Sequence, residues 1–490
     1  MRVEKRTSSV KRAAMITAAS RYSVVVFNLL FTMVLARILT PNEFGIVSVT
    51  SVFTAFFLML ADVGFARGVI QDKTLTEDDI TGIYSINIYI SLVIGLVFMP
   101  FSVGLAWFYG NEIYVPMGAL LSVVLFFSSA RSIPNALFMK EKRFLLVGVV
   151  NVFAAVAGGV AAIVMALFGF GVYALVMQTL ITALASFAWQ DVMARREFGV
   201  RFSLRPSLSG IHKIFGYSMN QFGFDSINYF ARNLDNILIG KVMGSTALGF
   251  YDKAYKLSTY PLNYLTFVIS SALHPILSEY QDDVEYIYHR YISVAKFLSL
   301  SGVFISSICY FGADEVILFA FGDQWGEAVA PFKMLTISMW FQMTVSSCGA
   351  IYQSLGHTDT MLRSCLVFVP IQVLCIVVGV FSGSLGRCAA LVALSFILKF
   401  FVDYYFLIAK TFRMSYAGFL RKMLPDLIIT AAIAFVQIGI GATGVLNGMG
   451  AIASLAVKCL TVGAVFAVAV KATGEGRYLK AALPKKLRGK

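Results

Sequence analysis

Long apolar runs alternate with short polar segments along almost the whole chain. Runs of about 20 residues, each long enough to cross a hydrocarbon layer of about 30 Å as a helix, recur from one end to the other. The runs are continuous rather than alternating, which excludes a membrane β-barrel and predicts an all-α integral membrane protein with about 14 transmembrane helices. The predicted spans are residues 16–37, 44–65, 80–107, 115–138, 145–168, 171–190, 215–240, 247–272, 291–313, 328–351, 362–382, 387–409, 424–442 and 449–471.

The charged residues are few and unevenly distributed. Of the 490 residues, 58% are hydrophobic and only 13% are charged, whereas a soluble protein carries about a quarter charged residues. The net charge of +14 would by itself fit a nucleic-acid partner, but the basic residues concentrate in alternate segments between apolar runs. We therefore exclude nucleic acid as a partner and expect both termini on the cytoplasmic side of the membrane.

The sequence contains no recognisable catalytic, metal or cofactor motif. The six cysteines fall in or beside apolar runs without a CxxC pair, and there are four histidines, so we expect buried thiols rather than disulfides or a metal site. A P-loop lysine motif, an HExxH pair and a dinucleotide fingerprint are all missing. The chain is therefore expected to be no enzyme, to need no cofactor and to carry out no ATP-driven transport alone.

Two similar halves flank a polar, basic segment near the middle of the apolar region. The turn motif in residues 34–46 matches the motif in residues 238–250 in its basic residue, its short turn and its glycine. Six helices precede each restart, so the halves are expected to be parallel repeats about an axis along the membrane normal. The predicted domains are an N-terminal lobe (1–190, spans 1–6), a cytoplasmic linker (191–214), a C-terminal lobe (215–409, spans 7–12) and a helix pair with a basic tail (410–490).

The seventh and eighth predicted spans are too polar for helices that only face lipid. Polar residues of the seventh recur at steps of three and four and so share one face, and the eighth carries acidic and basic side chains in an apolar run. A charge in hydrocarbon costs about 3 kcal/mol or more, so these side chains must turn towards protein or water. The polar residues of the seventh span are Gln221, Asp225, Asn228, Arg232 and Asp235 or Asn236; those of the eighth are Asp252, Lys253, Lys256, Tyr260 and Asn263.

Intramembrane cations are the candidate substrate-binding residues. The planar guanidinium group of arginine suits bidentate phosphate binding, and exclusion of water strengthens each contact. We therefore predict a cationic cavity that binds an anionic head group. Its candidate residues are Arg21, Asn28, Arg131, Asn228, Arg232, Lys253 and Lys256. The alternative is internal ion pairing, with Arg232 bound to Asp225 or Asp235 and Lys256 bound to Asp252.

Three carboxylates are candidates for coupling or gating. Asp62, near the inner end of the second span, is placed to form a gate pair with Arg21. Asp225 and Asp235 are candidates for ion coupling, because a buried carboxylate can titrate in the physiological range. The coupling ion, whether H⁺ or Na⁺, stays open.

Several segments carry a resemblance to a known family. They are Leu60–Phe65, Arg131–Pro134, Ala231–Gly240, Ala247–Lys256 and Pro275–Gln281. Together they resemble the Wzx-type polysaccharide transporters of the multidrug/oligosaccharidyl-lipid/polysaccharide exporter superfamily. The resemblance covers about residues 10–420 and is most specific around 230–281, whereas the last two predicted helices are generic.

The resemblance implies a fold, a substrate and a cellular setting. It implies two six-helix lobes in a V, alternating access, and a cationic cavity between the lobes. It also implies a flippase of the bacterial cytoplasmic membrane that moves a glycan on polyprenyl pyrophosphate, among membrane lipids and alongside the polysaccharide polymerase and glycosyltransferases of its pathway. Two alternatives remain. One is a MATE-like multidrug or cation antiporter, for which acidic cavity walls are expected. The other is a membrane glycan polymerase or ligase, for which a large outer loop is expected.

Overall fold

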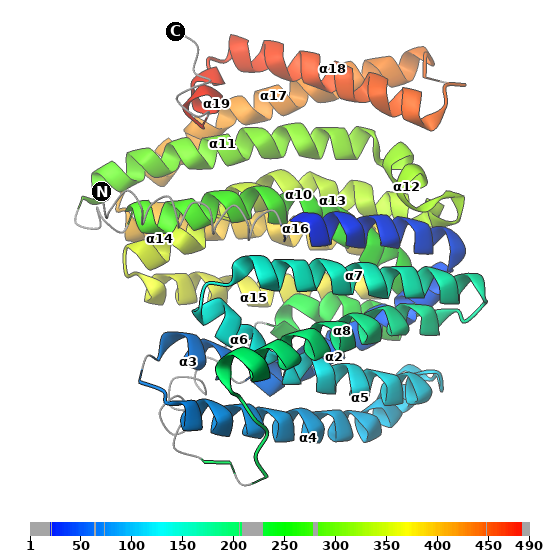
Figure 1. The fold of residues 1–490 in the computed structure, drawn as a ribbon. Coiled ribbons are helices and arrows are strands. Elements are labelled where there is room, and N and C mark those ends of the chain that lie inside the picture. Colours follow the sequence, from blue (N-terminus) through cyan, green and yellow to red (C-terminus); the bar gives the residue numbers. More distant parts are fainter. Residues whose placement is uncertain are drawn as a thin grey trace. The chain divides into compact units, whose positions relative to one another are not determined.

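Helices form the regular structure of the chain, and the part that this computed structural model describes contains no strand (Figure 1). The described residues are 20, 22–62, 65–72, 74–204, 206–207, 229–277, 283–446 and 448–482, with backbone alone at 264–277 and 480–482. The predicted all-α class is confirmed over these residues.

Ten helices of the described residues are long and apolar enough to cross a membrane. They are α2 (Pro41–Asp62), α4 (Glu77–Tyr109), α5 with α6 (Tyr114–Lys140), α7 (Phe144–Leu167), α8 (Val172–Phe198), α11 (Val284–Phe311), α15 (Thr358–Phe381), α16 with a π-helical end (Leu385–Thr411), α17 (Tyr416–Thr443) and α18 (Ala451–Ala472). The chain is therefore a multi-pass membrane protein. Each of the ten coincides with a predicted span to within a few residues, except that α8, α11 and α17 extend farther.

The other four predicted spans are helical where the structure describes them, but shorter, more polar or interrupted. They correspond to the helix Tyr22–Ile38, a helix over 229–242, α10 (Ser245–Leu277), and α13 (Val329–Val345) followed by α14 (Cys348–Ser354). Residues 215–228 of the seventh predicted span lie outside the described residues. The total of 14 transmembrane helices therefore stays a prediction.

Short helices occupy several segments that the apolar pattern left as loops. α8 continues to Phe198, so the predicted linker 191–214 begins with helix. The segment between the predicted spans 291–313 and 328–351 is largely α12 (Ala313–Phe321) and a 3₁₀-helix (Asp323–Ala328). Helices α3 (Phe65–Gln71) and α19 (Gly476–Ala482) complete the set. Such segments are too short for a hydrophobic period to reveal them.

The chain divides into two compact units, Met1–Gly249 and Phe250–Lys490. In the first unit α5 packs against α4 and α8, and α7 packs against α8 (Figure 1). In the second, α13 packs against α11 and α16, while α17 and α18 lie beside α11. The predicted lobe boundaries at 190, 215 and 409 stay predictions.

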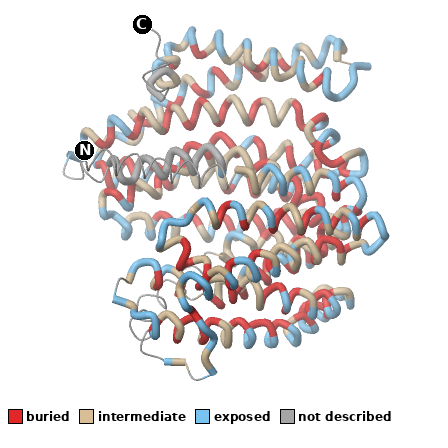
Figure 2. The backbone as a smooth tube through the Cα atoms, viewed as in Figure 1, coloured by how far each residue is buried: buried red, intermediate tan, exposed pale blue. Residues whose placement is uncertain are grey.

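Helix α18 presents apolar side chains on its outer surface. Figure 2 shows mostly exposed and intermediate residues along it. Ile452, Leu460 and Val468 are each about 70% exposed (69%, 73% and 69%). An exposed apolar face on a spanning helix is suited to acyl chains rather than to water.

The two predicted repeat motifs meet through their glycines. A Cβ atom on Gly45 would lie 1.7 Å from the carbonyl oxygen of Ser245, and a Cβ on Gly249 would lie 1.9 Å from the carbonyl oxygen of Pro41. Pro41 and Ser245 are the first residues of α2 and α10, so equivalent positions of the two motifs touch each other reciprocally. Only glycine permits this approach of the two helix backbones.

Candidate functional site

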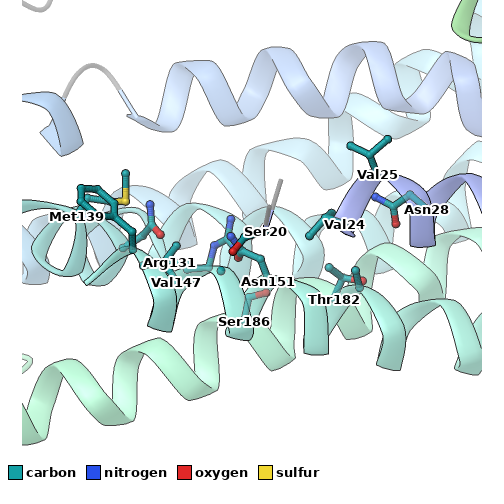
Figure 3. A pocket seen from close by; sticks show the side chains of 14 residues that line it. Ser20, Val24, Val25, Asn28, Arg131, Met139, Val147, Asn151, Thr182 and Ser186 are labelled. Atoms are coloured by element: carbon teal, nitrogen blue, oxygen red, sulfur yellow. The ribbon is translucent and has the colours of Figure 1, made fainter. Parts of the chain in front are cut away.

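A pocket of about 510 Å³ lies within the first unit. Its walls come from the N-terminal helix, the junction of α5 with α6, α7 and α8 (Figure 3). The lining residues are Ser20, Val24, Val25, Asn28, Arg131, Asn135, Met139, Phe144, Val147, Gly148, Asn151, Ala155, Thr182 and Ser186. The pocket brings together two predicted binding residues, Asn28 and Arg131, that are far apart in sequence.

The pocket wall mixes one cation with neutral polar groups. Among the described lining residues Arg131 is the single charged side chain, and none of them is a carboxylate. Three asparagines, Asn28, Asn135 and Asn151, add amide groups that both donate and accept hydrogen bonds. Figure 3 shows Arg131 and Asn151 together, with Asn28 farther along the pocket. The wall therefore suits a ligand that is negatively charged at one end and hydroxyl-rich beyond it.

A break between two helices places Arg131. α5 ends at Ala130 and α6 begins at Ser132, and Pro134 has no N–H to give to the carbonyl of Ala130. The fully buried Asn87 of α4 compensates, because its Nδ2 lies 3.0 Å from the carbonyl oxygen of Ser129 and 3.5 Å from that of Ala130. A side chain of a neighbouring helix thus donates hydrogen bonds to the carbonyl groups at the helix break.

The hydrogen-bond partner of the Arg131 side chain is an uncharged residue. Its NH1 donates to Oδ1 of Asn151 on α7 at 3.2 Å, and no ion pair joins it to a carboxylate among the residues with described side chains. An amide orients the guanidinium group without cancelling its charge. Since an uncompensated charge among spanning helices is costly, the pocket favours an anionic ligand.

A buried hydroxyl on α8 reinforces this interpretation. Ser186 is fully buried and lines the pocket, and its Oγ has no hydrogen-bond partner in the described structure. One turn farther along α8, Gln190 is also fully buried with both amide atoms unpaired there. Unsatisfied buried polar groups cost about 1–3 kcal/mol each, so a polar ligand that reached Ser186 would recover part of that cost.

Close helix packing narrows the pocket at Gly148. A Cβ on Gly148 of α7 would lie 2.0 Å from Oγ of Ser20. The absent side chain lets the start of the N-terminal helix approach α7 and form one wall of the pocket.

Asp62 lies beside the same helix break. Ser132, the first residue of α6, donates from Oγ to Oδ1 of Asp62 at 3.0 Å. The predicted gating carboxylate is thus bonded to the residue that follows Arg131. Its predicted partner Arg21 lies outside the described residues.

The predicted cations of the seventh and eighth spans do not line this pocket. Arg232 is exposed, whereas Asp235 is 4% exposed and its Oδ1 accepts from the backbone N–H of Asn236 at 2.8 Å.

Asp252 lies between two of the predicted cations. Its Oδ2 is 2.8 Å from Nζ of Lys256 and 4.0 Å from Nζ of Lys253. In this structure Lys256 therefore forms the internal ion pair with Asp252 that was the alternative to substrate binding. Two further candidates, Asn228 and Asp225, lie outside the described residues.

The lining residues that the sequence analysis missed are single polar residues in apolar helices. Asn151 lies alone in an apolar run, and no periodic pattern of polar residues marks it as a pocket residue. On α8 a signal exists, since Thr182, Ser186 and Gln190 recur every four residues and share one face. That stripe is uncharged, so the pattern of intramembrane charges does not reveal it.

Comparison with known proteins identifies relatives that match most of the chain. The family model described as "Polysaccharide biosynthesis protein" matches residues 34–330, more than half of the chain. The teichuronic acid biosynthesis protein TuaB of Bacillus subtilis (strain 168) is 22% identical over 444 residues, 89% of each chain. The lipopolysaccharide biosynthesis protein WzxC of Escherichia coli (strain K12) is 23% identical over 460 residues, again 89% of each.

Solved structures share the fold at low sequence identity. The lipid II flippase MurJ in its inward closed conformation aligns with a TM-score of 0.72 at 11% identity, covering 94% of this chain and 99% of MurJ. An inward-facing multidrug resistance MATE family transporter aligns with a TM-score of 0.62 at 15% identity, covering 82% and 99%. The fold is thus like that of MurJ and the MATE transporter, and the chain belongs to the polysaccharide biosynthesis protein family.

Proposed function

We propose that this protein is a flippase that moves oligosaccharide units linked to polyprenyl pyrophosphate across the membrane for cell-surface polysaccharide assembly. Family membership supports this role, as do relatives named for teichuronic acid and lipopolysaccharide biosynthesis. A further relative is named the succinoglycan biosynthesis transport protein ExoT, of Rhizobium meliloti (strain 1021), at 22% identity over 356 residues. The MurJ-like fold agrees with a carrier of a lipid-linked substrate.

The observation that carries the proposal is the charge of the pocket in the first unit. Arg131 keeps its positive charge beside the neutral Asn151, and the buried hydroxyl of Ser186 has no hydrogen-bond partner among the described residues. A pyrophosphate offers acceptor oxygens for both groups. The amides of Asn28 and Asn135 can replace hydrogen bonds that sugar hydroxyls lose on leaving water, which is the main barrier to moving a glycan through hydrocarbon.

A MATE-like antiporter is the second candidate, and the pocket disfavours it. A cationic drug would need acidic walls, whereas the described lining holds one arginine and no carboxylate. We likewise propose that the chain is a transporter rather than a glycan polymerase or ligase. One relative is named a transport protein, and another is named a lipopolysaccharide biosynthesis protein.

The proposal extends to the lobes, the membrane, the pathway and the route of the substrate. Two six-helix lobes, residues 1–190 and 215–409, would alternate access in the bacterial cytoplasmic membrane, with both termini in the cytoplasm. Glycosyltransferases would supply the substrate and a polysaccharide polymerase would consume it. Arg21, Asn228, Arg232, Lys253 and Lys256 would contact the substrate along its route, and Asp62, Asp225 and Asp235 would act in gating or coupling.

The test replaces Arg131 in cells that depend on this protein. Without the protein, short lipid-linked glycan units should accumulate, as measured by mass spectrometry of extracted lipids. Arg131→Ala should fail to clear them, with a loss in rate of about tenfold or more because a charge-assisted contact to phosphate is removed. Arg131→Lys should restore part of the activity, since the charge returns without the planar geometry.

The control is Arg67→Ala, because Arg67 is exposed on α3 and does not line the pocket. It should clear the lipid-linked units at the normal rate. Normal clearance by Arg131→Ala at equal membrane abundance would refute the role of the pocket.

A further inference from the structure

Three charged side chains meet deep inside the second unit. Nζ of Lys296 on α11 lies 2.6 Å from Oδ1 of Asp426 on α17 and 2.9 Å from Oε2 of Glu475, which follows α18. Lys296 and Asp426 are 0% exposed and Glu475 is 4% exposed. We call these residues the Lys296 triad. Their positions, far apart in sequence, converge between two spanning helices and the start of the C-terminal tail.

The neighbours of the Lys296 triad are polar but uncharged. Oγ of Ser299 donates to Oδ2 of Asp426 and in turn accepts from Nε1 of Trp340 at 2.6 Å. Nζ of Lys296 also donates to the carbonyl oxygen of Lys422 at 2.9 Å, and it lies 5.9 Å from the ring centre of Tyr478.

Charged side chains nearby point elsewhere. Lys422 lies over the ring of Tyr288, Arg477 lies over the ring of Tyr478, and both are exposed, as is Lys471. Among the residues with described side chains, neither Asp426 nor Glu475 forms an ion pair with a second cation. The rest of the surroundings is apolar, including Leu300, Val303, Ile429, Ile433 and Val462.

One ammonium group therefore faces two carboxylates. With both carboxylates ionised, the triad would carry one uncompensated negative charge in a site closed to water. Burying such a charge is expensive, and a buried carboxyl group can instead take up a proton and become neutral. Two carboxylates that share one cation also repel each other, and one proton bound between them would remove both this repulsion and the excess charge.

We propose that the Lys296 triad is a proton-binding site in which Asp426 and Glu475 share one proton at neutral pH. Release of that proton would leave a net negative charge between α11, α17 and the segment that leads into α19. Proton occupancy is thereby linked to the packing of these three elements. The inference does not depend on the substrate of the transporter.

The experiment measures proton release by the purified full-length protein in detergent, titrated from about pH 5 to about pH 9. The wild-type protein should release about one proton more over this range than Glu475→Gln or Asp426→Asn, because either variant leaves one carboxylate neutralised by Lys296. Glu327→Gln is the matched control, since Glu327 is exposed, and it should release as many protons over this range as the wild type. Identical titrations for wild type and Glu475→Gln would overturn the proposal.

A measurement on the wild type alone covers the case in which the variants do not fold. Infrared difference spectra between about pH 6 and about pH 9 should show loss of the carbonyl stretch of a protonated carboxylic acid. Absence of that band at neutral pH would equally overturn the proposal.

Discussion

At the scale of single residues, the site depends on how the protein satisfies a broken helix. Spanning helices need every backbone carbonyl paired inside the protein, because hydrocarbon offers no donor. The stretch Tyr114–Lys140 breaks at Arg131, and Asn87 supplies donors to the two carbonyls before the break. Asn87 therefore stabilises the backbone directly before Arg131, the residue that binds Asn151.

Replacement of Asn87 by leucine tests this coupling. Asn87→Leu should lower the free energy of unfolding by about 1–3 kcal/mol, because a buried carbonyl loses its donor. It should also reduce glycan translocation, since the backbone before Arg131 loses the hydrogen bonds that fix its position. Thermal unfolding in detergent and clearance of lipid-linked glycan check the two effects.

Ser51→Ala is the control, because Ser51 is exposed and donates only within its own helix. An Asn87→Leu protein as stable and active as Ser51→Ala would contradict the role given to Asn87.

At the scale of helices, reciprocal glycines join α2 and α10. Gly249→Ala should destabilise the first unit by about 1–3 kcal/mol, because the new methyl group would overlap the carbonyl of Pro41. Gly441→Ala in α17 is the matched control, since no atom lies within 4 Å of the position of its Cβ. There alanine should be neutral or should gain up to about 1 kcal/mol in helix propensity. Equal melting temperatures for the two variants would count against the close contact.

A second link between helices makes a prediction about pH. Burial opposes ionisation of Glu315 on α12, but hydrogen bonds from Lys458 and Ser454 of α18 outweigh it and hold the pKa of Glu315 below its ordinary value of 4.5. A carboxylate with a lowered pKa stabilises the fold above its unfolded pKa, and that stabilisation is lost as the pH falls through the lowered value.

Glu315→Gln should therefore cost about 2 kcal/mol near neutral pH and progressively less below about pH 4. Melting temperatures of wild type and variant over this range provide the measurement. A difference that does not change with pH would show that the charge of Glu315 contributes nothing to the contact.

At the scale of the whole molecule, the apolar pattern predicts most of the membrane helices. Ten predicted spans coincide with helices long enough to cross a membrane, because a run of about 20 apolar residues has few other stable arrangements. The short helices α12 and α19 lie below that length, so no period reveals them. The division into two units was also outside the reach of hydropathy, which reports neither packing nor contact.

The candidate site was predictable only in part. Arg131 stood out because a charge inside an apolar run is rare, and Asn28 was the second of the predicted binding residues that line the pocket. The partner of Arg131 is a neutral residue of another helix, Asn151, and only the fold brings it and the pocket residue Ser186 near. Asp426 and Glu475 were likewise invisible as partners of Lys296, since tertiary packing alone joins positions so far apart.

The most direct test of the account is translocation by the purified protein in liposomes, with a polyprenyl-pyrophosphate-linked oligosaccharide in one leaflet. Enzymatic modification of the glycan from outside measures its arrival in the outer leaflet. The account predicts rapid transfer by the wild type, transfer about tenfold or more slower with Arg131→Ala, and partial recovery with Arg131→Lys. Transfer by Arg131→Ala at the wild-type rate, or no transfer by the wild type above empty liposomes, would contradict it.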